Sequence, residues 1–290
     1  METWIAAWQN LPAHLSPYLF QIGSFQLRWY SLMYLAAFAC IYLLVTYRIR
    51  RENLPYTAET IQDYFVWAIL GVILGGRLGY VFFYNPHYYL HHPLEIIFPF
   101  QFSGGFHFVG ISGMSYHGGL IAVLLATLIF CRRRGIDFWR FADLFSSAIP
   151  LGYTFGRIGN FVNGELYGRA TDVPWGMVFP LDPTHLLRHP SQLYEAFFEG
   201  IALFALLWTI RKRFTFTGAL FAVYITGYGV VRFFIEFFRE PDVQLGFVLG
   251  PFSMGQLLCL MMIGTGMILY AIRREWGKGG LQDRSSISSV

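Results

Sequence analysis

Seven long apolar runs constrain this chain more than any other feature of its sequence. A helix that crosses a bilayer needs about 20 predominantly apolar residues. The predicted spans are 29–47, 64–84, 114–131, 138–156, 191–210, 217–237 and 251–271. The chain is 55% hydrophobic and only 13% charged, whereas soluble domains carry about 25% charged residues. We therefore expect an all-α polytopic membrane protein with about seven transmembrane helices. The span at 138–156 is the least regular, because Asp143 and Pro150 interrupt it.

Basic residues follow every second predicted span. These bursts are Arg48, Arg50 and Arg51, then Arg132 to Arg134, then Arg211 to Arg213, and finally Arg273, Arg274 and Lys278. Cytoplasmic loops carry an excess of Lys and Arg, so this alternation predicts an N-terminus outside and a C-terminus in the cytoplasm. The formal net charge of +4 is thereby explained by topology, and nucleic-acid binding is not indicated.

The chain is predicted to form one membrane-embedded domain over residues 1–276. Its first 28 residues contain Trp4 and Trp8 but no Lys or Arg before Arg28. That composition does not match a cleavable signal peptide, which begins with a positive region, and favours an interfacial leader. Residues 277–290, which end in RSSISSV, are predicted to be a disordered cytoplasmic tail.

A second set of arginines lies away from the cytoplasmic bursts. Its members are Arg28, Arg77, Arg157, Arg169, Arg188, Arg232 and Arg239. An arginine inside a span costs about 2.5–3.5 kcal/mol on insertion scales, so a partner must compensate for it. One interpretation is pairing with internal carboxylates, as for Arg232 and Glu236, which lie four residues apart. The other is an anionic ligand, most naturally a phosphate held by guanidinium forks.

The densest polar stretch follows a predicted span and reads GRIGNFVNGELYGR, from Gly156 to Arg169. Its glycines permit tight turns and close approach of the backbone. Asn160, Glu165 and the two arginines supply hydrogen-bond donors and acceptors. An ordinary turning loop does not need this many charged groups beside a membrane, so we interpret the stretch as part of a functional site.

His117 begins a predicted span in the stretch GMSYHGGL. A lone histidine at a helix end is more often structural, yet an ordinary pKa of about 6.5 suits a general base. No metal is expected, because no spacing such as HExxH occurs. No nucleotide-binding motif is present, and the absence of GxSxG means that a serine hydrolase is not indicated.

At this point the sequence resembles a known family, the bacterial phosphatidylglycerol–prolipoprotein diacylglyceryl transferases. The resemblance runs nearly from end to end. It rests on the ordered motifs RWYSLMY, GGRLGYVFFYN, GMSYHGGL, GRIGNFVNGELYGR, RHPSQLYE and GYGVVRFFIEFFREPD. The run from Gly156 to Arg169 is the signature of that family.

The resemblance implies an enzyme of the bacterial cytoplasmic (inner) membrane, with residues 1–276 as its catalytic domain and an active site toward the outer leaflet. Its partners would be phosphatidylglycerol, prolipoprotein signal peptides and membrane lipids. It would attach a diacylglyceryl group to the thiol of the lipobox cysteine and release glycerol 1-phosphate, with no metal or nucleotide. Two alternatives stay open, an anion transporter and a phospholipase-type lipid enzyme.

The same resemblance implies roles for individual residues. Those implied or hypothesised to be catalytic are His117, Arg157, Arg239 and Glu165, with His117 as the family histidine often proposed as base. Those implied to bind substrate are Arg157, Asn160, Gly168, Tyr30, Tyr228, Arg232 and Glu236. We further hypothesise that Arg157 and Arg239 stabilise the charge that develops on the departing phosphate, with Arg232 held by Glu236.

Overall fold

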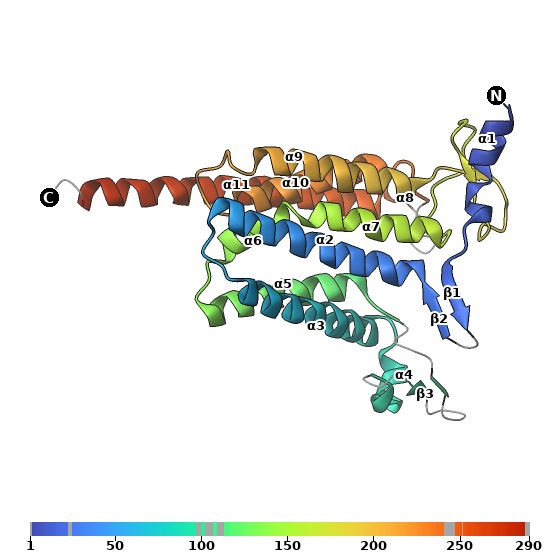
Figure 1. Cartoon of the computed structure of the whole chain (residues 1–290), viewed down its shortest axis with the longest axis horizontal. Coiled ribbons are helices and arrows are strands. Elements are labelled where there is room, and N and C mark those ends of the chain that lie inside the picture. Colours follow the sequence, from blue (N-terminus) through green and yellow to red (C-terminus); the bar gives the residue numbers. More distant parts are fainter. Residues whose placement is uncertain are drawn as a thin grey trace. The chain divides into compact units, whose positions relative to one another are not determined.

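The computed structural model describes residues 2–22, 25–96, 100–101, 107–108, 113–240, 247–250 and 252–287. It is mostly helical, and five of its helical segments are long and apolar enough to cross a membrane. They are Trp29–Glu52 (α2), Ala58–Phe83 (α3), Tyr116–Arg134 (α5), Ser191–Ile210, and the part Met254–Gly277 of α11. A shorter apolar helix, α10, spans Ala219–Ile235. This is a multi-pass membrane protein (Figure 1).

The predicted span at 138–156 is divided between two helices, α6 at Phe138–Ser146 and α7 at Ile149–Val162. Pro150 lies in the first turn of α7, where its missing N–H costs nothing, whereas it would break the interior of one long helix. The Asp143 carboxylate accepts hydrogen bonds from Gly218 N at 2.7 Å and Phe221 N at 2.8 Å. This polar residue therefore caps the start of α10.

The segment Ser191–Ile210 is one continuous helical rod whose middle part is a π-helix. It begins as α8 (Ser191–Tyr194), widens into a π-helix, η3 (Glu195–Ala202), and ends as α9 (Leu203–Ile210). The Thr154 hydroxyl on α7 donates to Ala196 O at 3.1 Å, which satisfies a carbonyl of the wide turn. π-Helical turns occur frequently at functional sites.

The chain forms two compact units. The first contains residues 1–48 and 142–290, and the second contains residues 49–141. In the second unit α3 and α5 approach closely through glycines, since a Cβ at Gly79 would lie 2.8 Å from Gly118 Cα. Arg77 donates from Nε to Ile96 O at 3.0 Å, so this arginine fastens the chain between the two helices.

Short hairpins occur between the helices, although the sequence predicted an all-α chain. In the first unit β1 (Tyr18–Ile22) pairs with β2 (Phe25–Arg28), β5 (Met177–Val178) with β6 (Leu187–Arg188), and β7 (Phe247–Leu249) with β8 (Phe252–Ser253), each antiparallel. In the second unit β3 (Phe100–Gln101) pairs with β4 (His107–Phe108). The leader also contains α1 (Glu2–Gln9) and η1 (Leu11–His14).

Two short helices complete the second unit, α4 (Pro86–His91) and η2 (Pro93–Ile96). At the other end of the chain, α11 runs from Met254 to Ile287. Its bounds include most of the segment 277–290, and the disorder predicted for that tail stays a prediction. Residues 288–290 of that segment lie outside the described residues.

Candidate functional site

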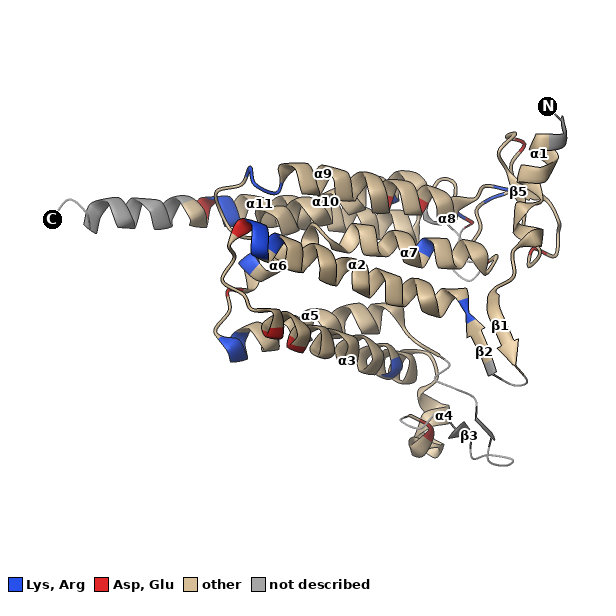
Figure 2. Cartoon of the chain, in the orientation of Figure 1, with Lys and Arg blue, Asp and Glu red and all other residues tan. Residues whose placement is uncertain are grey.

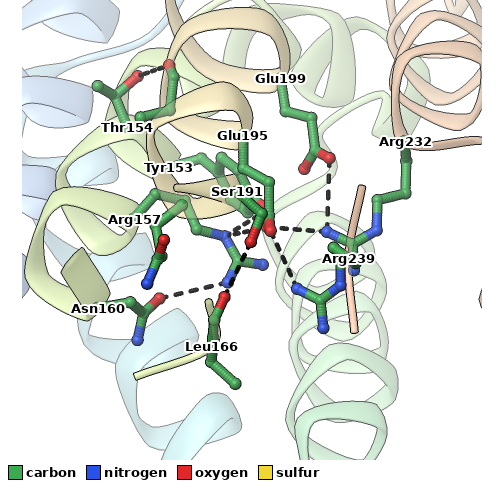
Figure 3. Close-up of polar contacts among 12 residues, drawn as sticks. Tyr153, Thr154, Arg157, Asn160, Leu166, Ser191, Glu195, Glu199, Arg232 and Arg239 are labelled. Carbon is green, nitrogen blue, oxygen red and sulfur yellow. Dashed lines mark hydrogen bonds and ion pairs between the residues drawn. The ribbon is translucent and has the colours of Figure 1, made fainter. Parts of the chain in front are cut away.

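Glu195, the first residue of η3, is the centre of an ion-pair cluster inside the first unit (Figure 3). Its Oε2 atom lies 2.8 Å from Arg157 Nε on α7 and 2.8 Å from Arg232 Nη1 on α10. Its Oε1 atom lies 3.0 Å from Arg239 Nη1, just beyond α10. One carboxylate therefore joins three arginines that are far apart in the sequence.

Two further carboxylates balance the charge of this cluster. Glu199 Oε1 lies 3.5 Å from Arg232 Nη1. Glu236 Oε2 lies 3.3 Å from Arg232 Nη2 and 3.4 Å from Arg239 Nε. The expected pairing of Arg232 with Glu236 is thus confirmed. The cluster is formally neutral, with three arginines and three glutamates.

Exposure differs between the two charge types in the cluster. The side chain of Glu195 is fully buried, whereas the side chains of Arg157, Arg232 and Arg239 are 15–16% exposed. The arginine side chains are therefore more accessible than the carboxylate that they share. This difference favours an anionic ligand over a cation.

Asn160 links the cluster to the loop that follows α7. Its Oδ1 accepts from Arg157 Nη1 at 3.3 Å, and its Nδ2 donates to Glu165 Oε1 at 2.8 Å. Gln192 Nε2 donates to Glu165 O at 2.6 Å. Glu165 is therefore connected to Arg157 through Asn160, and Gln192 holds its backbone in place.

Gly168 contributes through its backbone. Its N–H donates to His189 O at 2.8 Å, and it forms an isolated antiparallel bridge with Arg239. A Cβ at this position would meet Phe238 O, and it would lie 2.9 Å from both His189 O and His189 Cβ. Only glycine allows the loop to approach Arg239 this closely.

We expect Gly168→Ala to lower both stability and activity. The atoms that a methyl group would meet are mostly backbone, so they cannot rotate away, and overpacking of this kind costs about 1–3 kcal/mol. Thermal unfolding in detergent and the transfer assay described below measure the two effects. Gly156→Ala is the matched control, because a Cβ there meets nothing within 4 Å and alanine favours the α7 helix. Equal tolerance of both substitutions would contradict this account.

Three tyrosines border the cluster. The Arg157 Nε atom donates to Tyr153 Oη at 2.6 Å, and the ring of Tyr153 meets that of Tyr228 edge to face at 6.0 Å. Tyr30 on α2 packs against the α7 backbone, since a Cβ at Gly159 would lie 3.0 Å from its ring. Tyr30 and Tyr228 thus lie near Asn160 and Arg157, and their role in substrate binding stays a prediction.

His117 belongs to the second unit and is described there. It lies in the first turn of α5, with an exposed side chain. The hydroxyl of Ser115 caps that helix by accepting from Gly118 N at 3.2 Å. The start of α5 is therefore a well-defined helix end that presents the imidazole at its surface.

The other arginines of the predicted set in this unit make contacts of their own. Arg188 forms a fork on Asp182, with Nε 2.7 Å from Oδ2 and Nη2 3.2 Å from Oδ1. Arg169 Nε donates to Arg239 O at 2.7 Å. The Arg28 guanidinium lies over the Tyr18 ring, 5.3 Å from its centroid. Each of these three arginines therefore has an acceptor or an aromatic ring of the protein as a partner.

The pair Asp182 and Arg188 predicts an acid-sensitive stability. The hydrogen-bonded guanidinium lowers the pKa of the Asp182 carboxyl from 3.8 to about 2. A carboxyl with a depressed folded-state pKa stabilises the protein above its unfolded pKa, and this contribution is lost as the pH falls from about 4 to about 2. We expect the unfolding temperature of Asp182→Asn to fall less steeply over that range than that of the unchanged protein. Parallel curves would contradict the assignment.

Comparison with known proteins identifies the family. The family model described as prolipoprotein diacylglyceryl transferase matches residues 17–272. The chain belongs to this family. A phosphatidylglycerol–prolipoprotein diacylglyceryl transferase of Chlorobaculum tepidum is 54% identical over 275 residues, which cover 94% of each chain. Proteins with the same name from Bordetella avium and Wolinella succinogenes are 48% identical over 259 residues and 45% identical over 275. These alignments cover 88% and 93% of this chain and 94% and 98% of the relatives.

The prolipoprotein diacylglyceryl transferase match includes the whole cluster. Sequence reasoning nevertheless missed Glu195, Glu199 and Tyr153 as site residues. The signal was present, because two carboxylates four residues apart inside an apolar span need partners as much as an arginine does. Among the residues that the structure describes, no group of three or more His, Cys, Asp or Glu side chains is placed to hold a metal ion.

Proposed function

We propose that this protein transfers the diacylglyceryl group of phosphatidylglycerol to the thiol of a prolipoprotein cysteine, the first step of lipoprotein maturation. The sulfur attacks the carbon of the diacylglyceryl group that is bonded to the phosphate oxygen. A C–S bond forms, the C–O bond breaks, and its electron pair leaves with the phosphate as glycerol 1-phosphate. The thiol proton passes to a base. The names of the relatives support both substrates.

The observation that carries this proposal is the convergence of three guanidinium groups on one buried carboxylate. Among the described contacts, Arg157 uses Nε and Nη1, and a guanidinium has five N–H donors. Its Nη2 is suited to donate to a phosphate. Arg157 and Arg239 stabilise the negative charge that grows on the departing phosphate, which is usually the largest catalytic effect.

The other residues support this phosphate site. Arg232 is held by Glu236 and Glu195. Asn160 orients Arg157, and Glu165 orients Asn160 in turn. Gly168 brings the loop to Arg239, while Tyr30 and Tyr228 contact the substrate in this proposal. The reaction requires no metal or other cofactor in this scheme.

His117 is proposed as the base that removes the thiol proton. A free thiol has a pKa of about 8.5, so little thiolate exists at neutral pH. We expect His117→Ala and His117→Gln to slow transfer about 10²-fold or more, the usual contribution of a general base. Binding of phosphatidylglycerol should be unchanged. Near-normal transfer by both variants would remove His117 from this role.

The proposed topology has about seven spans, with the N-terminus outside and the C-terminus in the cytoplasm. In the first unit, the basic residues of α11, of the α9–α10 connection and of the end of α2 lie at one end of the helices (Figure 2). The two termini lie at opposite ends of that unit (Figure 1). These features support the proposed orientation, in which the arginine cluster lies toward the outer leaflet of the bacterial inner membrane.

Residues 1–276 are proposed to form one catalytic domain, with residues 1–28 as an interfacial leader and residues 277–290 in the cytoplasm. Its partners are phosphatidylglycerol, prolipoprotein signal peptides and surrounding membrane lipids, not nucleic acid. Both substrates are membrane-bound, so they reach the site from within the bilayer.

The test is to reconstitute the purified protein with phosphatidylglycerol and a cysteine-containing lipobox peptide. Peptide mass and glycerol phosphate release are then followed together. A diacylglyceryl mass gain that requires the cysteine supports the transferase. Glycerol phosphate release without peptide modification indicates a hydrolase instead. Absence of both, with folded protein, contradicts the proposal and directs attention to anion flux in liposomes.

A further inference from the structure

Leu166 has a backbone conformation that leucine rarely adopts. Three non-glycine residues in the described part of the chain have a positive φ, namely Asn53 at 48°, Leu166 at 59° and His185 at 51°. Asparagine and histidine are enriched in this left-handed region, whereas a bulky residue there is an outlier. Glycine would take the same conformation without strain.

Neighbouring residues hold this strained turn in place. The fully buried Ser191 donates from Oγ to Leu166 O at 3.0 Å (Figure 3), and the fully buried Gln192 donates to Glu165 O at 2.6 Å. Gly164, two residues earlier, also has a positive φ of 70°. Strain that is held in this way is concentrated at functional sites.

Packing does not explain the leucine side chain either. It is 47% exposed. The nearby hydrophobic core consists of Phe161, Met177 and Phe179, and it takes in Tyr167 but not Leu166. The position therefore carries an apolar side chain that neither the backbone nor the core requires.

The location of Leu166 indicates what it contacts. It directly follows Glu165, which Asn160 links to Arg157. It also lies beyond Val162, the last residue of α7, in the polar loop that carries Asn163 and Glu165. Leu181, which is 63% exposed, adds apolar surface near Gly164, since its Cγ lies 3.9 Å from a Cβ built there.

We propose that Leu166 is a specificity-determining residue that contacts an apolar side chain of the acceptor peptide. The inference rests on the proposed transferase function. The acceptor thiol must reach the carbon next to the phosphate, so the residues flanking the cysteine pass beside the loop that adjoins Arg157. The strained turn presents Leu166 to them.

The experiment compares Leu166→Gly, Leu166→Asn and Leu166→Met in the reconstituted assay, with the peptide and phosphatidylglycerol titrated separately. Glycine and asparagine both accept the left-handed conformation, so the loop keeps its shape while the apolar side chain is lost. We expect both to raise the peptide KM about tenfold or more, with the lipid KM unchanged. Methionine, which remains apolar, should stay close to the unchanged protein.

His185→Gly is the matched control, because it relieves a left-handed residue in the same outer segment. It should leave both KM values unchanged, and the unfolding temperatures of His185→Gly and Leu166→Gly should not fall below that of the unchanged protein. An unchanged peptide KM in Leu166→Gly and Leu166→Asn overturns the inference. A raised lipid KM with an unchanged peptide KM overturns it too, and points to an acyl-chain contact. Failure of the unchanged protein to modify any peptide would instead refute the proposed function.

Discussion

Arg157→Ala should reduce transfer by about 10²–10³-fold, the usual effect of removing one group that stabilises developing negative charge. Arg157 contacts both Tyr153 and Glu195 through Nε, and it contacts Asn160 through Nη1. The substitution therefore also removes one of the groups that connect α7 to η3. The rate is measured as the mass gain of the lipobox peptide at saturating phosphatidylglycerol.

Arg157→Lys separates charge from geometry in the same assay. Lysine keeps the positive charge but lacks the planar fork that holds two acceptors at once. We expect its rate to lie between those of Arg157→Ala and the unchanged protein. Full activity of the lysine variant would mean that charge alone suffices, and full activity of the alanine variant would exclude Arg157 from the phosphate site.

Glu195→Gln should produce the largest loss of stability. The fully buried carboxylate is within ion-pair distance of Arg157, Arg232 and Arg239, and its removal leaves uncompensated positive charge inside the protein. Breaking a buried ion pair by removing one partner costs about 3–5 kcal/mol. The measurement is the unfolding temperature in detergent micelles.

Glu240→Gln is the control for this prediction. Glu240 pairs with Arg188 at 3.0 Å, but its side chain is 48% exposed, and exposed pairs contribute about 0–1 kcal/mol. A phosphate should partly replace the lost carboxylate, so added phosphatidylglycerol should raise the unfolding temperature of Glu195→Gln more than that of the unchanged protein. Equal unfolding temperatures for the two glutamine variants would show that the cluster does not depend on Glu195.

Features that depend on local sequence were predictable here. Apolar runs placed the helices at 29–47, 114–131 and 191–210 close to their observed bounds, and the composition of 156–169 marked one side of the site. The spacing of Arg232 and Glu236 predicted their contact, because residues four apart share a helix face.

Features that depend on tertiary packing were not predictable. Glu195 contacts Arg157 and Arg239, which are 38 and 44 residues away in the sequence. No local sequence pattern indicates that these residues are close in space. The break before Ile149 depends on Pro150 and on how Asp143 caps a helix 75 residues later. The left-handed turn at Leu166 arises from hydrogen bonds supplied by Ser191 and Gln192.

Deletion of a residue from the π-helix at Glu195–Ala202 should affect folding and catalysis differently. Its i→i+5 hydrogen bonds accommodate more residues per turn than an α-helix does. Deleting one residue there would let the rod rewind as an ordinary α-helix that still crosses the membrane. The same deletion would rotate Glu195 away from Glu199 and from Arg232. Crossing the bilayer therefore does not require the extra residue of the π-helix, whereas the ion pair of Glu195 with Arg232 does.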